Sequence, residues 1–99
     1  MTTGYDRTLS EHARLTILKV LARQAGYHAN DSVLADALAA YGFRLSRDRV
    51  RTEIDWLAEQ GLLTVAQAEH LVVATATRRG VDVAEGLATT AGVKRPGPH

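Results

Sequence analysis

The sequence predicts one mainly α-helical domain with a small β-hairpin, in the order helix, helix, helix, hairpin, helix. Two observations predict this order. Apolar residues recur at helical spacing in three successive segments, each followed by a glycine. After Gly61 this period gives way to two short runs rich in β-branched residues. The chain has 99 residues, of which 45% are hydrophobic, so it is long enough for one core.

The first helix is expected over residues 10–25, with Ser10 as its N-cap and Gly26 as its stop. Its apolar residues cover more than half of its circumference. Such a helix either lies deep in the domain or presents a second face to another subunit. On the second alternative, Ile17 and Val20 are candidate contacts of a homodimer.

The second helix is expected to begin after Asn30 and to end at Gly42. The third is expected over residues 47–60, with Ser46 as its N-cap. Its inward face is formed by Val50, Ile54 and Leu57.

The hairpin strands are predicted at residues 62–65 and 71–75, joined by a connection over residues 66–70. Thr77 is the expected N-cap of a last helix over residues 78–87. These elements define a domain over residues 9–88.

The two ends are expected to be flexible: residues 1–8, and a tail over residues 89–99 that contains proline, glycine, Lys94 and Arg95. A basic flexible arm can track DNA or dock on a protein. A tail that only increases solubility is the alternative.

The segment Arg49–Leu63 has apolar residues at helical i, i+4, i+7 spacing, ends its helix on a glycine and turns at once into a strand. It resembles the recognition helix and first wing strand of winged-helix transcription regulators. Thr77–Ala84 resembles the helix that follows the wing in that superfamily. The resemblance implies a winged helix-turn-helix fold with the order α-α-α-β-β-α.

A closer resemblance covers nearly the whole chain and rests on four short segments and one further residue. The chain is similar to small ArsR-like, helix-turn-helix proteins of Mu-like phages and prophages, which are encoded among morphogenesis and packaging genes. The segments are Ala25–Tyr27 with Asn30, Ser46–Asp48, Trp56–Leu62 and Gly92–Pro96. The resemblance implies a DNA-binding transcriptional regulator or a DNA-packaging accessory. Metal sensing of the ArsR type uses cysteines, and this sequence has none.

In a winged helix the third helix lies in the major groove of DNA. Arginines around its N-terminal end could reach phosphates, and Ser46 and Thr52 are further candidate contacts. The arginines are Arg44, Arg47, Arg49 and Arg51. Three of the four residues furthest from the core are acidic, however: Asp48, Asp55 and Glu59 beside Thr52. The alternative is a solvated face in which Arg51 pairs with Asp55, and Asp48 with Arg51 or Arg44.

The predicted wing tip, Ala66–His70, has no fixed positive charge, which favours a structural hairpin over a DNA contact. Arg78 and Arg79 open the last helix, where they could contact phosphates beside the wing. The alternative is that they only solvate a helix capped by Thr77.

Trp56 lies at the side of the apolar stripe and is expected to be half covered. It could pack against the wing or the first helix. Alternatively it contacts a partner chain, because tryptophan is enriched among interface anchors. With the apolar first helix, this second alternative predicts a homodimer.

Several classes of function have no support in the sequence. There is no cysteine, no nucleotide-binding glycine motif and no catalytic motif, so we expect neither an enzyme nor a cofactor. The four histidines lack metal-ligand spacing, so no metal is expected. No signal peptide or membrane span is predicted, which indicates a cytoplasmic protein of the bacterial host. Two functions remain: binding of double-stranded DNA, or a protein-interaction module in phage assembly or packaging.

Overall fold

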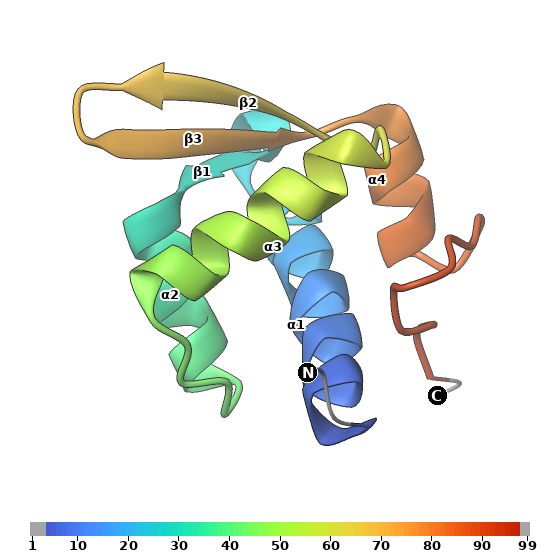
Figure 1. The fold of residues 1–99 in the computed structure, drawn as a ribbon. Helices are drawn as coiled ribbons and strands as arrows, with labels where there is room; N and C mark the ends of the chain where they lie inside the picture. Colours follow the sequence, from blue (N-terminus) through green and yellow to red (C-terminus); the bar gives the residue numbers. More distant parts are fainter. Residues whose placement is uncertain (1–3, 98–99) are drawn as a thin grey trace.

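The computed structural model describes residues 4–97 and has the predicted order of helices and hairpin (Figure 1). It is a winged helix, mainly helical, with a small antiparallel sheet. The helices are α1 (Gly4–Ala22), α2 (Asp31–Ala40), α3 (Arg47–Glu59) and α4 (Arg78–Ala84), with a 3-10 turn η1 (Ala25–Tyr27). The strands are β1 (His28–Asn30), β2 (Leu63–Ala68) and β3 (Leu71–Ala76).

The predicted N-caps of three helices are confirmed. The side chains of Asn30, Ser46 and Thr77 accept hydrogen bonds from backbone N–H groups three residues later. The distances to the nitrogens of Val33, Arg49 and Gly80 are 2.8, 3.0 and 3.1 Å. Local sequence therefore determines where α2, α3 and α4 begin.

Helix α1 differs from the prediction at both ends. It begins at Gly4 instead of Ser10, so residues 4–8 are helical and not a flexible extension. It ends at Ala22, and Gly26 lies in η1 with φ 73°. Ser10 is no cap, because its hydroxyl contacts Glu53 of α3. The rest of the predicted N-terminal extension, residues 1–3, lies outside the described residues.

The sheet has three strands in the order β1-β3-β2, all antiparallel. Strand β1 was not predicted, because three residues are too few to show an alternating pattern. The hairpin is longer than predicted, since Ala66 to Ala68 continue β2 and leave a two-residue turn, Glu69–His70. Glu69 has φ 57°, the positive value that short hairpin turns favour. Alanine and glutamine have little strand preference, so pairing with β3 decides this segment.

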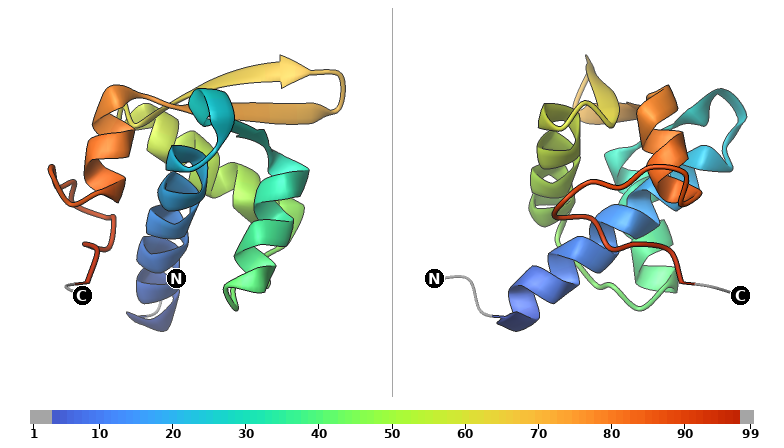
Figure 2. Two further views of the ribbon diagram at one scale, coloured as in Figure 1. Left: turned by 180° about the vertical axis from the view of Figure 1, so that it is seen from behind. Right: turned by 90° about the vertical axis from the view of Figure 1, so that its right-hand side faces the viewer.

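The core forms around α1, which lies between α2 and the C-terminal segment (Figure 2). Ile17 is fully buried in this core and cannot serve as a contact for a partner, which corrects the prediction for that residue. Val20 is partly buried and packs against the core. No described helix is both long and apolar enough to cross a membrane.

The C-terminal segment packs against the domain, contrary to the prediction of a flexible tail from residue 89. Val93 is buried, and the N–H of Lys94 donates to the carbonyl of Glu11 at 3.1 Å. The carbonyl of Gly92 accepts from Nη1 of Arg14 at 2.9 Å. Residues 89–97 therefore belong to the folded unit, while residues 98 and 99 lie outside the described part.

Candidate nucleic-acid interface

Helix α3 crosses the front of the molecule beneath the hairpin (Figure 1). Its N-terminal end lies near α2, and its C-terminal end leads into β2 at the base of the wing. The Ser46 hydroxyl accepts from the Arg49 N–H, so this serine has a capping role. The N-terminal end of a helix carries a partial positive charge that attracts anions.

Two of the predicted arginines meet at a buried carboxylate. Asp31, the first residue of α2, is fully buried. Nε of Arg47 lies 3.1 Å from its Oδ2, and Nε of Arg51 donates to the same oxygen. The backbone N–H of Val72 on β3 donates to Oδ1 at 3.2 Å. Asp31 thus joins α2, α3 and β3 in one cluster.

The same guanidinium groups hold the tip of the wing. Nη2 of Arg51 donates to the carbonyl of His70 at 2.6 Å, and Nη2 of Arg47 lies 3.4 Å from the same oxygen. We call Asp31, Arg47, Arg51 and the His70 carbonyl the wing-tip cluster. It places two partly exposed arginines between α3 and the hairpin turn, with side chains 42% and 35% exposed.

The pKa of Asp31 reflects this surrounding. Burial raises the pKa of a carboxyl group, because it disfavours the charged form. Hydrogen bonds from Arg47, Arg51 and the Val72 N–H outweigh burial and hold the pKa of Asp31 well below its usual range. The cluster therefore contains one carboxylate and two guanidinium ions at neutral pH, a net charge of +1.

A second buried carboxylate holds the arginine on the other flank of α3. Glu53 accepts from Nε of Arg49 at 2.9 Å, from Nε of Arg14 at 2.7 Å and from the Ser10 hydroxyl at 2.9 Å. Nη2 of Arg49 also donates to the Ser10 hydroxyl at 2.7 Å. Burial raises the pKa of Glu53, but the hydrogen bonds from Arg49, Arg14 and Ser10 together lower it by more than burial raises it. The pKa of Glu53 is therefore below its usual value. This Glu53 cluster joins α1 to α3.

Sequence reasoning missed both carboxylates, although their spacing contains a signal. Glu53 lies three residues after Val50 and four before Leu57, on the apolar stripe of α3. Asp31 lies three residues before Leu34, on the apolar stripe of α2. An acid on an apolar stripe requires a buried partner, and arginine is the residue best suited to that role.

Three of the four arginines predicted to contact phosphates are paired with buried carboxylates, while the prediction that they bind DNA stays a prediction. Arg47 and Arg51 are paired with Asp31, and Arg49 with Glu53. The alternative prediction paired Arg51 with Asp55, but in the structure Arg51 pairs with Asp31. Arg44, in the loop before α3, is exposed.

The outward face of α3 is acidic, as predicted. Asp48, Asp55 and Glu59 are exposed along it, together with Thr52, whose hydroxyl donates to the Asp48 carbonyl at 3.1 Å. In a conventional winged helix this face meets base edges. Here it would bring carboxylates against the phosphates on either side of the groove.

Arg78 and Arg79 lie apart from the wing-tip cluster. The side chain of Arg78 is 91% exposed, lies 3.5 Å from Asp82 and lines a pocket of about 190 Å³ with Tyr27 of η1. Nη2 of Arg79 lies 3.4 Å from the Thr89 carbonyl.

Trp56 packs within the chain. The guanidinium carbon of Arg14 lies 3.8 Å from its ring centroid, a cation–π contact. Gly92 also packs against the Trp56 ring, so closely that a Cβ added at Gly92 would lie 2.6 Å from ring atoms of Trp56. Trp56 is half-buried by α1 and the C-terminal segment, which supports the packing alternative over a partner contact.

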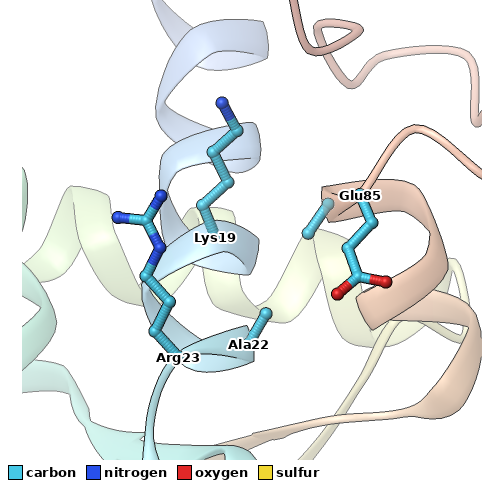
Figure 3. Close-up of a pocket in the computed structure, with 5 residues that line it drawn as sticks. Lys19, Ala22, Arg23 and Glu85 are labelled. Carbon is cyan, nitrogen blue, oxygen red and sulfur yellow. The ribbon is translucent and has the colours of Figure 1, made fainter.

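A further hollow, of about 240 Å³, lies between α1 and α4 (Figure 3). Lys19 extends from α1, Arg23 follows directly after the end of α1, and Glu85 is the C-cap residue of α4. Its mixed charge indicates no particular ligand. In the described part of the chain, no group of three acidic or histidine side chains is arranged to hold a metal ion.

Comparison with known proteins identifies relatives in a phage and in a bacterium. No family model matches the chain. The chain is 54% identical over 91 residues to the uncharacterized protein gp26 of Escherichia phage Mu, covering 92% of this chain and 94% of gp26. The chain belongs to the gp26 family. An uncharacterized protein of Haemophilus influenzae is 43% identical over 77 residues, covering 77% of this chain and 74% of that protein.

Among solved structures, this gp26-family chain is similar to Lactococcus lactis ZitR, a double mutant in its apo form. The TM-score is 0.60 at 25% identity. The match covers 82% of the chain but only 57% of the ZitR chain. The predicted resemblance is confirmed for a protein of phage Mu, while its ArsR-like part stays a prediction.

Proposed function

We propose that this gp26-family protein binds double-stranded DNA in the host cytoplasm, as a transcriptional regulator or packaging accessory of a Mu-like phage or prophage. The winged-helix fold and the similarity to ZitR support this function. The observation that carries it is the wing-tip cluster. Arg47 and Arg51 stand at the N-terminal end of α3, and Nη1 of each takes no part in the bonds to Asp31 and His70.

In this proposal, the arginines contact DNA phosphates more than base edges. The wing-tip cluster has a net charge of +1, and Arg44 adds a further exposed cation nearby in sequence. Guanidinium groups held by a buried carboxylate are already oriented, so binding a phosphate costs little side-chain entropy. The acidic face formed by Asp48, Asp55 and Glu59 disfavours deep insertion into the major groove.

This mode predicts a shallow salt dependence. With three arginines at phosphates, log Kd against log salt should have a slope of about 3 in magnitude, well below that of a strongly basic DNA-binding protein. Fluorescence anisotropy of a labelled duplex from the phage's own locus, titrated at several salt concentrations, measures it. Arg44→Ala should reduce the slope by about 1 without changing thermal stability.

Arg78→Ala is the matched control, because Arg78 is equally a surface arginine but lines the pocket beside Tyr27. Its slope should equal that of the unmodified protein. Absence of any duplex binding at about 50 mM salt contradicts the proposed function.

A protein-interaction module in phage assembly is the second candidate, favoured by the acidic face of α3. Exposed Asp48, Asp55 and Glu59 suit a basic protein surface better than DNA. Affinity capture on the immobilised protein from phage-producing cells, with a variant in which these acids are replaced by Asn and Gln, separates the two functions. Loss of a captured assembly protein in the variant supports the second, and unchanged or tighter DNA binding supports the first.

A further inference from the structure

Strand β2 forms an open edge of the sheet. In the order β1-β3-β2, only one side of β2 is paired (Figure 1). Figures 1 and 2 both show the hairpin projecting from the body with no element beyond β2. After the buried Leu63, every residue from Thr64 to Ala68 is exposed. The outer side of this strand is therefore accessible over most of its length.

The register identifies the backbone groups on this edge. Ala68 and Leu71 flank the two-residue turn and form the pair that exchanges hydrogen bonds. Because the pattern alternates, Ala66 and Thr64 also bond to β3, while Val65 and Gln67 direct their N–H and C=O groups outward. These outward groups form a template for another strand.

Nothing in β2 protects this edge. Soluble proteins guard open edges with charges, prolines, bulges or very short strands. The strand Leu63–Ala68 has six residues with no charge and no proline, and its register with β3 is continuous. Val65, a β-branched residue, is 41% exposed on it. The features that normally prevent strand addition are missing.

We propose that β2 pairs antiparallel with β2 of a second copy of this chain. A two-fold axis at Ala66 places Val65 opposite Gln67 of the partner, and Gln67 opposite the partner's Val65. Each such pair exchanges its outward N–H and C=O groups, so every outward donor finds an acceptor. The three-stranded sheets of the two copies then form one continuous sheet.

Charge and symmetry favour a second copy over an unrelated strand. The paired segment is uncharged, so two copies bring no like charges together along it. The acidic residue of each turn, Glu69, lies at one end of the paired strands, so the two copies of Glu69 lie at opposite ends. Self-pairing also places small side chains opposite each other, since Thr64 faces Ala68 of the second copy and Ala66 faces Ala66 of the second copy.

The experiment uses the full chain and two valine variants of matched exposure. Sedimentation equilibrium between about 10 μM and 1 mM, a range that covers weak dimers, should show the mass rising from 10.7 kDa toward twice that value. Val65→Lys should shift the dimer dissociation constant upward at least tenfold, because lysine on an edge strand prevents pairing. Val33→Lys, at a valine 48% exposed on α2, should leave it unchanged.

Amide hydrogen exchange tests the same pairing without a substitution. The amides of Val65 and Gln67 should exchange more slowly as protein concentration rises, while those of exposed loops should not change. A monomer throughout the concentration range overturns the proposal. So does a dimer that Val65→Lys leaves intact, or one that forms without protecting these two amides.

Discussion

Arg51 of α3 donates hydrogen bonds to both Asp31 and His70. Its Nε donates to the carboxylate of Asp31, and its Nη2 donates to the carbonyl of His70 at 2.6 Å. The three residues come from α2, α3 and the hairpin turn. A single guanidinium therefore connects the start of α2 to the tip of the wing.

Asp31→Asn should destabilise the protein by about 2–4 kcal/mol. The amide keeps the shape but removes the charge that balances two arginines, and breaking a buried pair is costly. Because Arg47 and Arg51 reach water, the lower part of this range is expected. Urea unfolding measures the change, with Asp36→Asn, at an exposed acid of α2, as a control that should stay within about 0.5 kcal/mol.

Stability should fall as the pH is lowered from 6 to 3. In the unfolded chain, the pKa values of Asp and Glu are about 3.8 and 4.5. The pKa values of Asp31 and Glu53 in the folded protein lie below these. Their contribution is therefore fully present above the unfolded pKa values and is lost as pH falls toward the folded ones. Chemical unfolding at several pH values measures the slope. Glu53→Gln should flatten it, and an equally steep slope in that variant would contradict the assignment.

Gly92→Ala should loosen the C-terminal segment. Gly92 has φ 94°, and an added Cβ would lie 2.6 Å from the Trp56 ring, so the ring or the segment must move. We expect a loss of about 2–3 kcal/mol and a red shift of tryptophan fluorescence as Trp56 gains water. Gly42→Ala has a similar φ of 92° but open space around the Cβ. It should lose only about 1 kcal/mol, with unchanged fluorescence.

Gly80→Ala should be destabilising although it lies within helix α4. Alanine ordinarily stabilises a helix by about 1 kcal/mol relative to glycine. Here its Cβ would lie 2.1 Å from the carbonyl oxygen of Leu62, which is backbone and cannot move aside. We expect a net loss above about 2 kcal/mol in thermal unfolding. Gly4→Ala in α1 meets nothing within 4 Å and should be neutral or slightly stabilising.

The parts of the fold that could be predicted are those decided by neighbours in sequence. Asn30, Ser46 and Thr77 cap their helices through residues three positions away. Strand β1 was missed because it is short and its pairing partner β3 lies far along the chain. The second half of β2 was missed because alanine and glutamine have little strand preference.

The candidate site was only partly predictable, for the same reason. Arginines near the start of α3 could be singled out, but the partner of Arg47 and Arg51 on α2, and the contacts of Glu53 with α1, could not. Asp31 precedes Arg51 by 20 positions, and Ser10 precedes Glu53 by 43. Spacing within one helix suggested Asp55 as the partner of Arg51, whereas burial of Asp31 made the more distant pairing stronger.

The wing-tip cluster also determines how freely the hairpin can move. A hairpin attached only at its base can swing toward a bound ligand, and its position is then set by binding. Here the turn is fastened to α3 through the His70 carbonyl as well. A phosphate that reaches from the unbonded Nη1 of Arg47 or Arg51 to the neighbouring Nη2 would compete with this carbonyl for the Nη2 N–H groups. In the proposed function, phosphate contact at Arg47 and Arg51 would therefore be coupled to the orientation of the hairpin.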